Sequence, residues 1–152
     1  MQESGVFDAI VVSTDDQEIA EVAKQCGAKV PFLRPKNLAD DFTPTVPVIK
    51  HAVDYCESNL GWKIDYVCCV FPCAPFITVT HIQESSKLIK NPKTNFVYPV
   101  MEYAHPIQRA FSLVDGKAVF REPECEMKRT QDLQTYYHDT GQFYFGKVEA
   151  WK

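Results

Sequence analysis

The 152-residue sequence lacks the marks of membrane, secreted and nucleic-acid-binding proteins. No apolar run approaches the about 20 residues that a membrane span needs, and no basic start leads into an apolar core, so neither a membrane anchor nor a signal peptide is predicted. Asp and Glu number 20 against 16 Lys and Arg, without a basic cluster, which argues against a nucleic-acid partner. Glycine is scarce, and no glycine-rich phosphate loop, nucleophilic triad or metalloprotease motif is present.

The cysteines form neither a metal-binding nor a disulfide pattern. None of them stands in a C-x-x-C pair, and a zinc site would want tighter pairing with histidine. We interpret them as structural thiols of a protein in the reducing cytoplasm. They are Cys26, Cys56, Cys68, Cys69, Cys73 and Cys125.

Length and composition favour a single domain over residues 1–152, and its first part alternates strand and helix patterns. Ala9–Ser13 is short, apolar and β-branched, which predicts a buried strand. Asp15 or Asp16 can then cap a helix in which Ile19 and Val22 share an apolar face.

The same alternation continues to about residue 90. A proline-rich loop covers Pro31–Thr45, and Thr45 can cap a second helix. Tyr66–Phe71 predicts a second fully apolar strand, and Thr78 can cap a third helix. Strands that alternate with helices predict an α/β fold with a mainly parallel sheet covered on both faces.

The remaining sequence is richer in strands. Phe96–Val100 and Gly141–Gly146 each predict a strand. Phe111–Phe120 holds Asp115-Gly116 between two apolar arms, which is the strongest short signal of a β-hairpin. We therefore predict a strand-rich hairpin region over residues 95–125 that projects from the α/β core.

Both ends of the sequence cut into expected elements. The opening "MQESG" resembles the end of a helix with a glycine stop, and the closing "KVEAWK" resembles the start of a helix. We expect the 152 residues to be an incomplete domain, with frayed termini as the alternative.

Polar or small residues follow both strands that are predicted to be parallel, at Ser13–Asp16 and Pro72–Pro75. Ligands of open α/β sheets bind beyond the carboxyl ends of the strands, so we predict that the two loops border one cleft. Two prolines fix the backbone around Cys73 and Ala74, which gives a ledge that a base or a sugar can approach closely. The alternative for Ser13–Asp16 is ordinary helix capping.

A second polar stretch runs from Lys128 to Phe145. It contains Arg129, whose guanidinium can bind a carboxylate or a phosphate through two parallel hydrogen bonds. It also holds Asp139, which can bind a metal or accept hydrogen bonds from sugar hydroxyls. For His138 the simpler interpretation is a hydrogen-bonded structural residue.

Four segments resemble the acylneuraminate cytidylyltransferases, the CMP-sugar synthetases, in the same order and at similar spacing. They are "VVSTDDQEIAEVAKQCGAKVPFLRP", "DYVCCVFPCAPF", "HPIQRAF" and "RTQDLQTYYHDTGQFYFG". The resemblance implies an enzyme that joins CTP to a nine-carbon acidic sugar of the pseudaminic or sialic type and releases pyrophosphate. It also implies Mg²⁺ as the cofactor, a homodimer, and a three-layer Rossmann-like nucleotide-diphospho-sugar transferase fold.

The resemblance assigns candidate residues to each substrate. The positions that match the nucleotide side are Ser13, Thr14, Asp15, Pro72, Cys73 and Ala74. The positions that match the sugar side are Gln108, Arg109, Arg129, Gln131, Asp139 and Gln142.

Two positions depart from the sialic acid branch of this family. Phe71 stands where many sialic acid enzymes have glutamine, and Thr140 stands where they usually have asparagine, whereas Gln108 and Arg109 fit the pseudaminic branch. The family's basic phosphate loop and its magnesium-binding aspartates would precede Met1 and follow Lys152, so we assign neither catalytic residues nor metal ligands within the sequence.

In the family, the region that matches residues 95–125 helps to form the dimer, so we predict self-association. One alternative is another nucleotide-sugar enzyme, such as a glycosyltransferase, which would need a D-x-D motif that Asp15-Asp16 does not supply. Another is a non-catalytic module that binds a nucleotide or a sugar, or that serves dimerisation.

Overall fold

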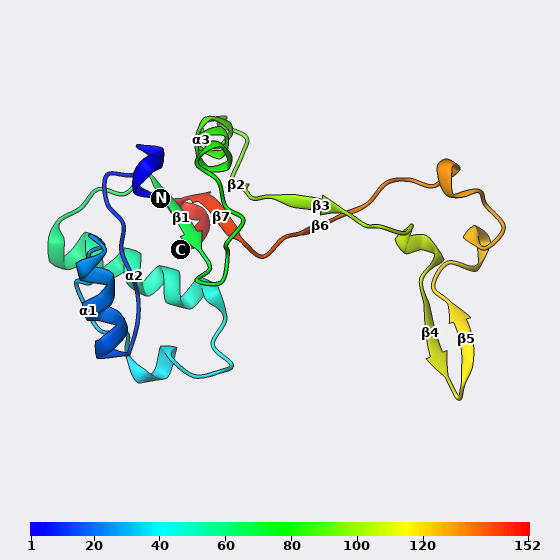
Figure 1. Ribbon diagram of the computed structural model, residues 1–152, viewed down its shortest axis with the longest axis horizontal. Helices are drawn as coiled ribbons and strands as arrows, with labels where there is room; N and C mark the ends of the chain where they lie inside the picture. Colours follow the sequence, from blue (N-terminus) through cyan, green and yellow to red (C-terminus); the bar gives the residue numbers. More distant parts are fainter. The chain divides into compact units, whose positions relative to one another are not determined.

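The computed structural model describes residues 1–152 and divides them into two units (Figure 1). Unit 1 comprises residues 1–98 and 142–152, and unit 2 comprises residues 99–141. Unit 1 contains four α-helices and a three-stranded sheet, whereas unit 2 contains two pairs of strands. None of the helices combines the length and the apolar character that a membrane span requires.

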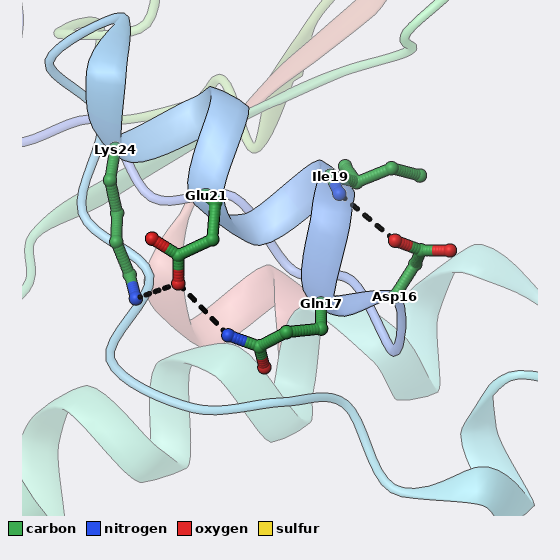
Figure 2. Close-up of polar contacts among 5 residues, drawn as sticks. All are labelled: Asp16, Gln17, Ile19, Glu21 and Lys24. Carbon is green, nitrogen blue, oxygen red and sulfur yellow. Dashed lines mark hydrogen bonds and ion pairs between the residues drawn. The ribbon is translucent and has the colours of Figure 1, made fainter.

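Helix α1 (Gln17–Gln25) begins at one of the two capping residues that the sequence predicts. Asp16 accepts a hydrogen bond from the amide of Ile19 at 2.9 Å, as Figure 2 shows. This bond satisfies one of the amide groups that the first helical turn leaves without a partner. Further along the helix, Glu21 pairs with Lys24 at 3.0 Å on the exposed surface.

The predicted apolar face of α1 is not buried. Ile19 and Val22 are 54% and 57% exposed, and Ala20 is the residue that the helix buries. Helical spacing identifies residues that share a face, but the positions of neighbouring segments decide which face meets the protein.

The other helices begin near the predicted residues. Helix α2 (Thr45–Leu60) buries Val53 and Cys56. Its N-cap is Pro44 and no side chain caps it, so the predicted cap at Thr45 is wrong. Thr78 caps α3 (Val79–Leu88) in a capping box with His81. Helix α4 is Val148–Trp151. Single 3₁₀ turns lie at Gln2–Ser4, Lys36–Leu38, Ile107–Arg109, Pro123–Cys125 and Thr130–Asp132.

The sheet of unit 1 has the order β1-β7-β2, and both of its pairings are antiparallel. Its strands are β1 (Tyr66–Val70), β7 (Phe143–Lys147) and β2 (Phe96–Val97). The mainly parallel sheet predicted from the sequence is therefore not observed among these strands. The partner that β1 receives lies more than 70 residues further along the chain, and apolar composition does not specify in which direction such a partner runs.

The first predicted strand is reduced to a single bridge. Ala9–Ser13 makes one parallel bridge, between Val11 and Lys29, with backbone hydrogen bonds of 2.8 and 3.0 Å on either side. The prediction of a parallel core strand at Ala9–Ser13 is therefore wrong for this chain, because its residues pair at one position only and stay half-buried.

The core of unit 1 lies between the sheet and α3. Ile82 and Ile89 pack against Phe143 and Phe145 of β7, all four at 4% exposure or less. Val6 and other half-buried apolar residues surround this cluster. In Figure 1, α2 is drawn on the side of the β1–β7 pair opposite to α3.

Unit 2 is built on two strand pairs. β3 (Val100–Glu102) pairs antiparallel with β6 (Tyr137–Asp139), and β4 (Phe111–Val114) pairs antiparallel with β5 (Lys117–Phe120). The strand predicted at residues 96–100 is split into β2 and β3 at Pro99, which has no amide hydrogen to donate. The Pro99 carbonyl instead accepts a hydrogen bond from the Thr140 amide at 3.2 Å.

The β4–β5 hairpin confirms its sequence signal. Asp115 and Gly116 have φ angles of 50° and 74°, the left-handed pair of a tight hairpin turn. Phe111 lies opposite Phe120 with ring centroids 5.8 Å apart, and Leu113 on the same face is 73% exposed. Unit 2 therefore presents much of its apolar surface to solvent rather than to a core of its own.

Candidate functional site

In unit 1, the junction Ser13–Asp16 is held by a residue that the sequence analysis did not identify. The backbone amide of Arg34 donates to the Thr14 carbonyl at 2.7 Å, and its guanidinium lies 3.5 Å from an Asp15 carboxylate oxygen. Thr14 is buried, and its hydroxyl accepts a hydrogen bond from the Asp16 amide at 3.1 Å. Arg34 lies near the end of the segment "VVSTDDQEIAEVAKQCGAKVPFLRP", about 20 residues from the junction, so no short-range sequence pattern predicts this contact.

Two polar atoms of this junction, the Ser13 hydroxyl and the Arg34 Nε, are buried without a hydrogen-bond partner in the protein. The His51 Nδ1 of α2 is buried without a partner as well. The ring of His51 packs edge-on against Phe32 at 4.8 Å, which fixes the imidazole beside the segment that carries Arg34. Because an unpaired buried polar atom costs about 1–3 kcal/mol, these atoms are suited to hydrogen bonds with a polar ligand.

The loop that follows β1 meets β7 at the candidate residue Gln142. The Phe71 amide donates to the Gln142 carbonyl at 3.0 Å, and the Gln142 Oε1 is buried without a partner. Pro72 and Cys73 are exposed, and Ala74 is half-buried. The ledge predicted from the sequence is thus an accessible loop that starts beside an unpaired amide oxygen. That it shares a cleft with Ser13–Asp16 stays a prediction.

Aromatic rings line the same face of the sheet as Gln142. The Tyr144 ring lies 5.8 Å from Phe71 and 5.3 Å from Tyr98. The register pairs Cys69 with Tyr144, so these side chains point away from the core formed by Phe143 and Phe145.

The thiols of β1 are unsuited to nucleophilic chemistry. Burial raises the pKa of Cys68 to about 12 and that of Cys69 to about 11, because the charged thiolate is disfavoured away from water. These two cysteines remain protonated at neutral pH, which agrees with a structural role.

Unit 2 contains a pocket of about 420 Å³, a volume in the range of small-molecule sites. Arg109 is its main cation and donates to the Thr130 hydroxyl at 3.4 Å and to the Glu126 carbonyl at 3.3 Å. No Asp or Glu lines the pocket. The lining residues are Tyr103, His105, Pro106, Ile107, Arg109, Ala110 and Thr130.

Gln108 is more buried than a direct ligand contact requires. It is only 5% exposed, and its side-chain amide donates to the Gln134 carbonyl at 2.8 Å, which ties the 3₁₀ turn Ile107–Arg109 to the segment before β6. Its Oε1 is also buried and has no hydrogen-bond partner in the protein.

The remaining candidates of unit 2 are exposed or already paired. Arg129 makes two hydrogen bonds to the carboxylate of Asp132, at 2.7 and 3.1 Å. Asp139 accepts a hydrogen bond from the Gly141 amide at 2.9 Å, and Gln131 is exposed. His138 lies 2.8 Å from the Asp139 carbonyl and packs on Tyr103, in agreement with the structural interpretation.

The one grouping of three metal-ligating side chains does not fit Mg²⁺. Glu122, Glu124 and Cys125 bring their ligand atoms within 4.8 Å of one another. One of the three is a buried cysteine whose sulfur contacts Lys128 at 3.7 Å, whereas Mg²⁺ prefers an octahedron of oxygen atoms. Glu122, Glu124 and Cys125 therefore do not form a magnesium site.

Comparison with known proteins decides the family. Residues 1–148 match the family described as "Cytidylyltransferase". The chain belongs to the cytidylyltransferase family. It is 41% identical over 150 residues to pseudaminic acid cytidylyltransferase of Campylobacter jejuni serotype O:2, which covers 97% of this chain and 64% of that protein.

More distant cytidylyltransferases match over nearly the same residues. A Helicobacter pylori protein named "Pseudaminic acid cytidylyltransferase and UDP-2,4-diacetamido-2,4,6-trideoxy-beta-L-altropyranose hydrolase" is 33% identical over 98% of this chain and 28% of its own length. N-acylneuraminate cytidylyltransferase A of Danio rerio is 28% identical over 97% of this chain and 33% of its own. The chain spans 64% of the length of the Campylobacter cytidylyltransferase.

These matches confirm the resemblance read from the four segments. They extend over both units, so the Arg34 junction in unit 1 and the Arg109 pocket in unit 2 both belong to the matched cytidylyltransferase sequence. The observed fold is mixed α/β.

Proposed function

We propose that this protein transfers CMP from CTP to a nine-carbon acidic sugar of the pseudaminic or sialic type and releases pyrophosphate. The observation that carries the proposal is the 41% identity to a pseudaminic acid cytidylyltransferase over 97% of the chain. In the reaction, the anomeric hydroxyl of the sugar attacks the α-phosphorus of CTP, and the bond to pyrophosphate breaks. Such transfers depend on positioning and on cations that neutralise developing charge.

The nucleotide half of the proposed site is the junction in unit 1. Ser13, Thr14 and Asp15 provide it, together with Arg34, whose unpaired buried Nε can donate to a carbonyl or phosphate oxygen. Pro72, Cys73 and Ala74 serve as the ledge on which the nucleotide or the sugar rests. The Ser13 hydroxyl and His51 offer two more unpaired polar atoms.

The sugar half is proposed to use amide, carboxylate and guanidinium groups. A nine-carbon acidic sugar offers one carboxylate and many hydroxyls, which suit these groups as hydrogen-bond partners. Gln142 is one candidate, and its Oε1 has no hydrogen-bond partner in the protein. The other candidates are Gln108, Arg109, Arg129, Gln131 and Asp139.

The proposal for the whole protein also includes its metal, its core architecture and its oligomeric state. We propose that the enzyme uses Mg²⁺ as its metal and has a three-layer Rossmann-like core. The free cysteines fit a reducing cytoplasm. The exposed apolar face of the β4–β5 hairpin supports a homodimer, because such faces are commonly buried between subunits.

The test is pyrophosphate release by the full-length protein with CTP, Mg²⁺, and either pseudaminic acid or N-acetylneuraminic acid. Product is expected with CTP and an acidic sugar, and little with UTP. Arg34→Met should raise KM for CTP by about tenfold or more, because a charged hydrogen bond contributes about 1.5–3 kcal/mol. Lys36→Met removes an exposed cation two residues away and is the matched control. Absence of any CMP-sugar would favour a non-catalytic binding module instead.

A further inference from the structure

Two arginines of unit 2 are candidates for the carboxylate of the acidic sugar, and the structure distinguishes them by their pairing. Arg129 is already bound to a carboxylate, with two hydrogen bonds of 2.7 and 3.1 Å to Asp132. An arginine and an aspartate in this two-pronged arrangement neutralise each other. A sugar carboxylate would have to displace Asp132, and the net attraction of the pair for a second anion is small.

Arg109 has no such partner. It forms no ion pair, and its two side-chain hydrogen bonds go to neutral oxygens, the Thr130 hydroxyl and the Glu126 carbonyl. These contacts hold the guanidinium in place without cancelling its charge. The charge and part of the hydrogen-bonding capacity of Arg109 are therefore available to a ligand.

The surroundings of Arg109 suit a carboxylate attached to a carbon skeleton. The pocket of about 420 Å³ that it lines contains no acidic side chain, and the ring nitrogens of His105 add a hydrogen-bond donor or acceptor. Tyr103 and Ile107 give apolar walls, against which the carbon atoms of a ligand can rest. Arg109 itself is exposed, so its guanidinium is accessible to an anion that enters the pocket.

We propose that Arg109, and not Arg129, binds the carboxylate of the acidic sugar, with Thr130 and the Glu126 carbonyl as its anchors. The inference rests on the proposed function. The carboxylate of these sugars is attached to the anomeric carbon, which also bears the reacting hydroxyl, so binding it fixes the orientation of that carbon in the pocket of unit 2. Arg109 then contributes to KM for the sugar, whereas its effect on KM for CTP is small.

The decisive experiment compares an acidic sugar with its methyl ester, which keeps the shape and loses the charge. The probes are N-acetylneuraminic acid and its methyl ester, and pseudaminic acid where it is available, with the full-length protein and saturating CTP. The wild type is expected to prefer the acid by about ten- to hundredfold in kcat/KM. Arg109→Met should reduce this preference to below about threefold, and Arg109→Lys should give an intermediate value. Arg129→Met should retain the preference, whatever its overall rate.

Loss of the acid preference in Arg129→Met, or its retention in Arg109→Met, overturns the proposal. Arg109→Met also removes two anchoring contacts, so circular dichroism must report that it folds. Should it not fold, the wild type decides by NMR: the Arg109 side-chain Nε–H signal is expected to shift with the acid and not with the ester, and the opposite pattern refutes the assignment. If the wild type makes no CMP-sugar at all, the proposed function fails. The same NMR titration then still tests whether Arg109 binds the carboxylate of the sugar.

Discussion

The backbone amide of Phe71 donates a hydrogen bond to the carbonyl of Gln142 at 3.0 Å. This bond continues the β1–β7 ladder by one residue beyond Val70 and joins two sequence segments that are 71 positions apart. It places the unpaired Oε1 of Gln142 at the start of the loop that the sequence singles out as a ligand ledge. We expect a residue with a buried, unpaired oxygen beside a candidate ligand loop to contribute to ligand binding at the expense of stability.

Gln142→Met tests that division of roles. The substitution keeps the length of the side chain and removes the unpaired oxygen, so the free energy of unfolding should stay unchanged or rise by up to about 1 kcal/mol. The kcat/KM for the sugar should fall by about three- to tenfold, the value of a neutral hydrogen bond. Urea unfolding and pyrophosphate release measure the two effects. Gln25→Met, at an exposed position of α1, is the control, and a strong loss of stability at Gln142 would show that the oxygen has a partner.

The N-cap of α1 provides a prediction about stability alone. Asp16→Ala removes the 2.9 Å hydrogen bond to the Ile19 amide and should lower the free energy of unfolding by about 0.5–2 kcal/mol. Asp16→Asn should cost much less, because asparagine caps a helix about as well as aspartate. Chemical denaturation of both variants checks the difference. Equal losses in the two would mean that charge at the helix start, and not the capping bond, carries the effect.

Alkylation should separate the cysteines by burial. With a pKa of about 12, Cys68 is a thiolate in only about one molecule in 10⁴ at pH 8, against about one in four for an ordinary thiol of pKa about 8.5. Iodoacetamide at pH 8 should therefore modify the exposed Cys26 and Cys73 within minutes and spare Cys68 and Cys69. Mass spectrometry of peptides measures the extent of alkylation at each cysteine. The control is the protein unfolded in urea, in which all of these cysteines are expected to react.

The same raised pKa values predict a loss of stability at alkaline pH. The unfolded chain releases the protons of Cys68 and Cys69 near pH 8.5, whereas the folded chain keeps them until about pH 11 to 12. The thiols therefore stabilise the folded state below pH 8.5, and this contribution is lost as the pH rises toward the folded values. Cys68→Val should flatten the fall of unfolding free energy between pH 8.5 and 10.5, and an unchanged slope would contradict the assignment.

The apolar face of the β4–β5 hairpin is the surface through which we expect the protein to self-associate. Phe111, Leu113 and Phe120 lie on one face of β4–β5, and Ser112 lies on the other. Leu113→Glu places a charge on the apolar face and should convert the proposed dimer into a monomer in analytical ultracentrifugation. Ser112→Glu adds the same charge to the opposite face and should leave the dimer intact. A dimer that survives Leu113→Glu uses a different surface.

Local elements of this protein follow from the sequence alone. The caps at Asp16 and Thr78, and the turn at Asp115-Gly116, were all predicted in type and near their observed positions. Each depends on interactions between residues at most a few positions apart, so the sequence contains both partners of the interaction. The four quoted segments likewise identified the cytidylyltransferase family without any knowledge of the fold.

The tertiary structure alone decided which distant segments meet. Nothing in the apolar run at Tyr66–Phe71 specifies that β7 pairs with it in the antiparallel direction, and nothing in the spacing of α1 exposes Ile19. The contact of Arg34 with Asp15 also joins positions far apart in the chain. Side-chain pattern determines local conformation and which residues share a face, whereas partners across long separations are chosen by packing of the whole unit, which short-range preferences do not encode.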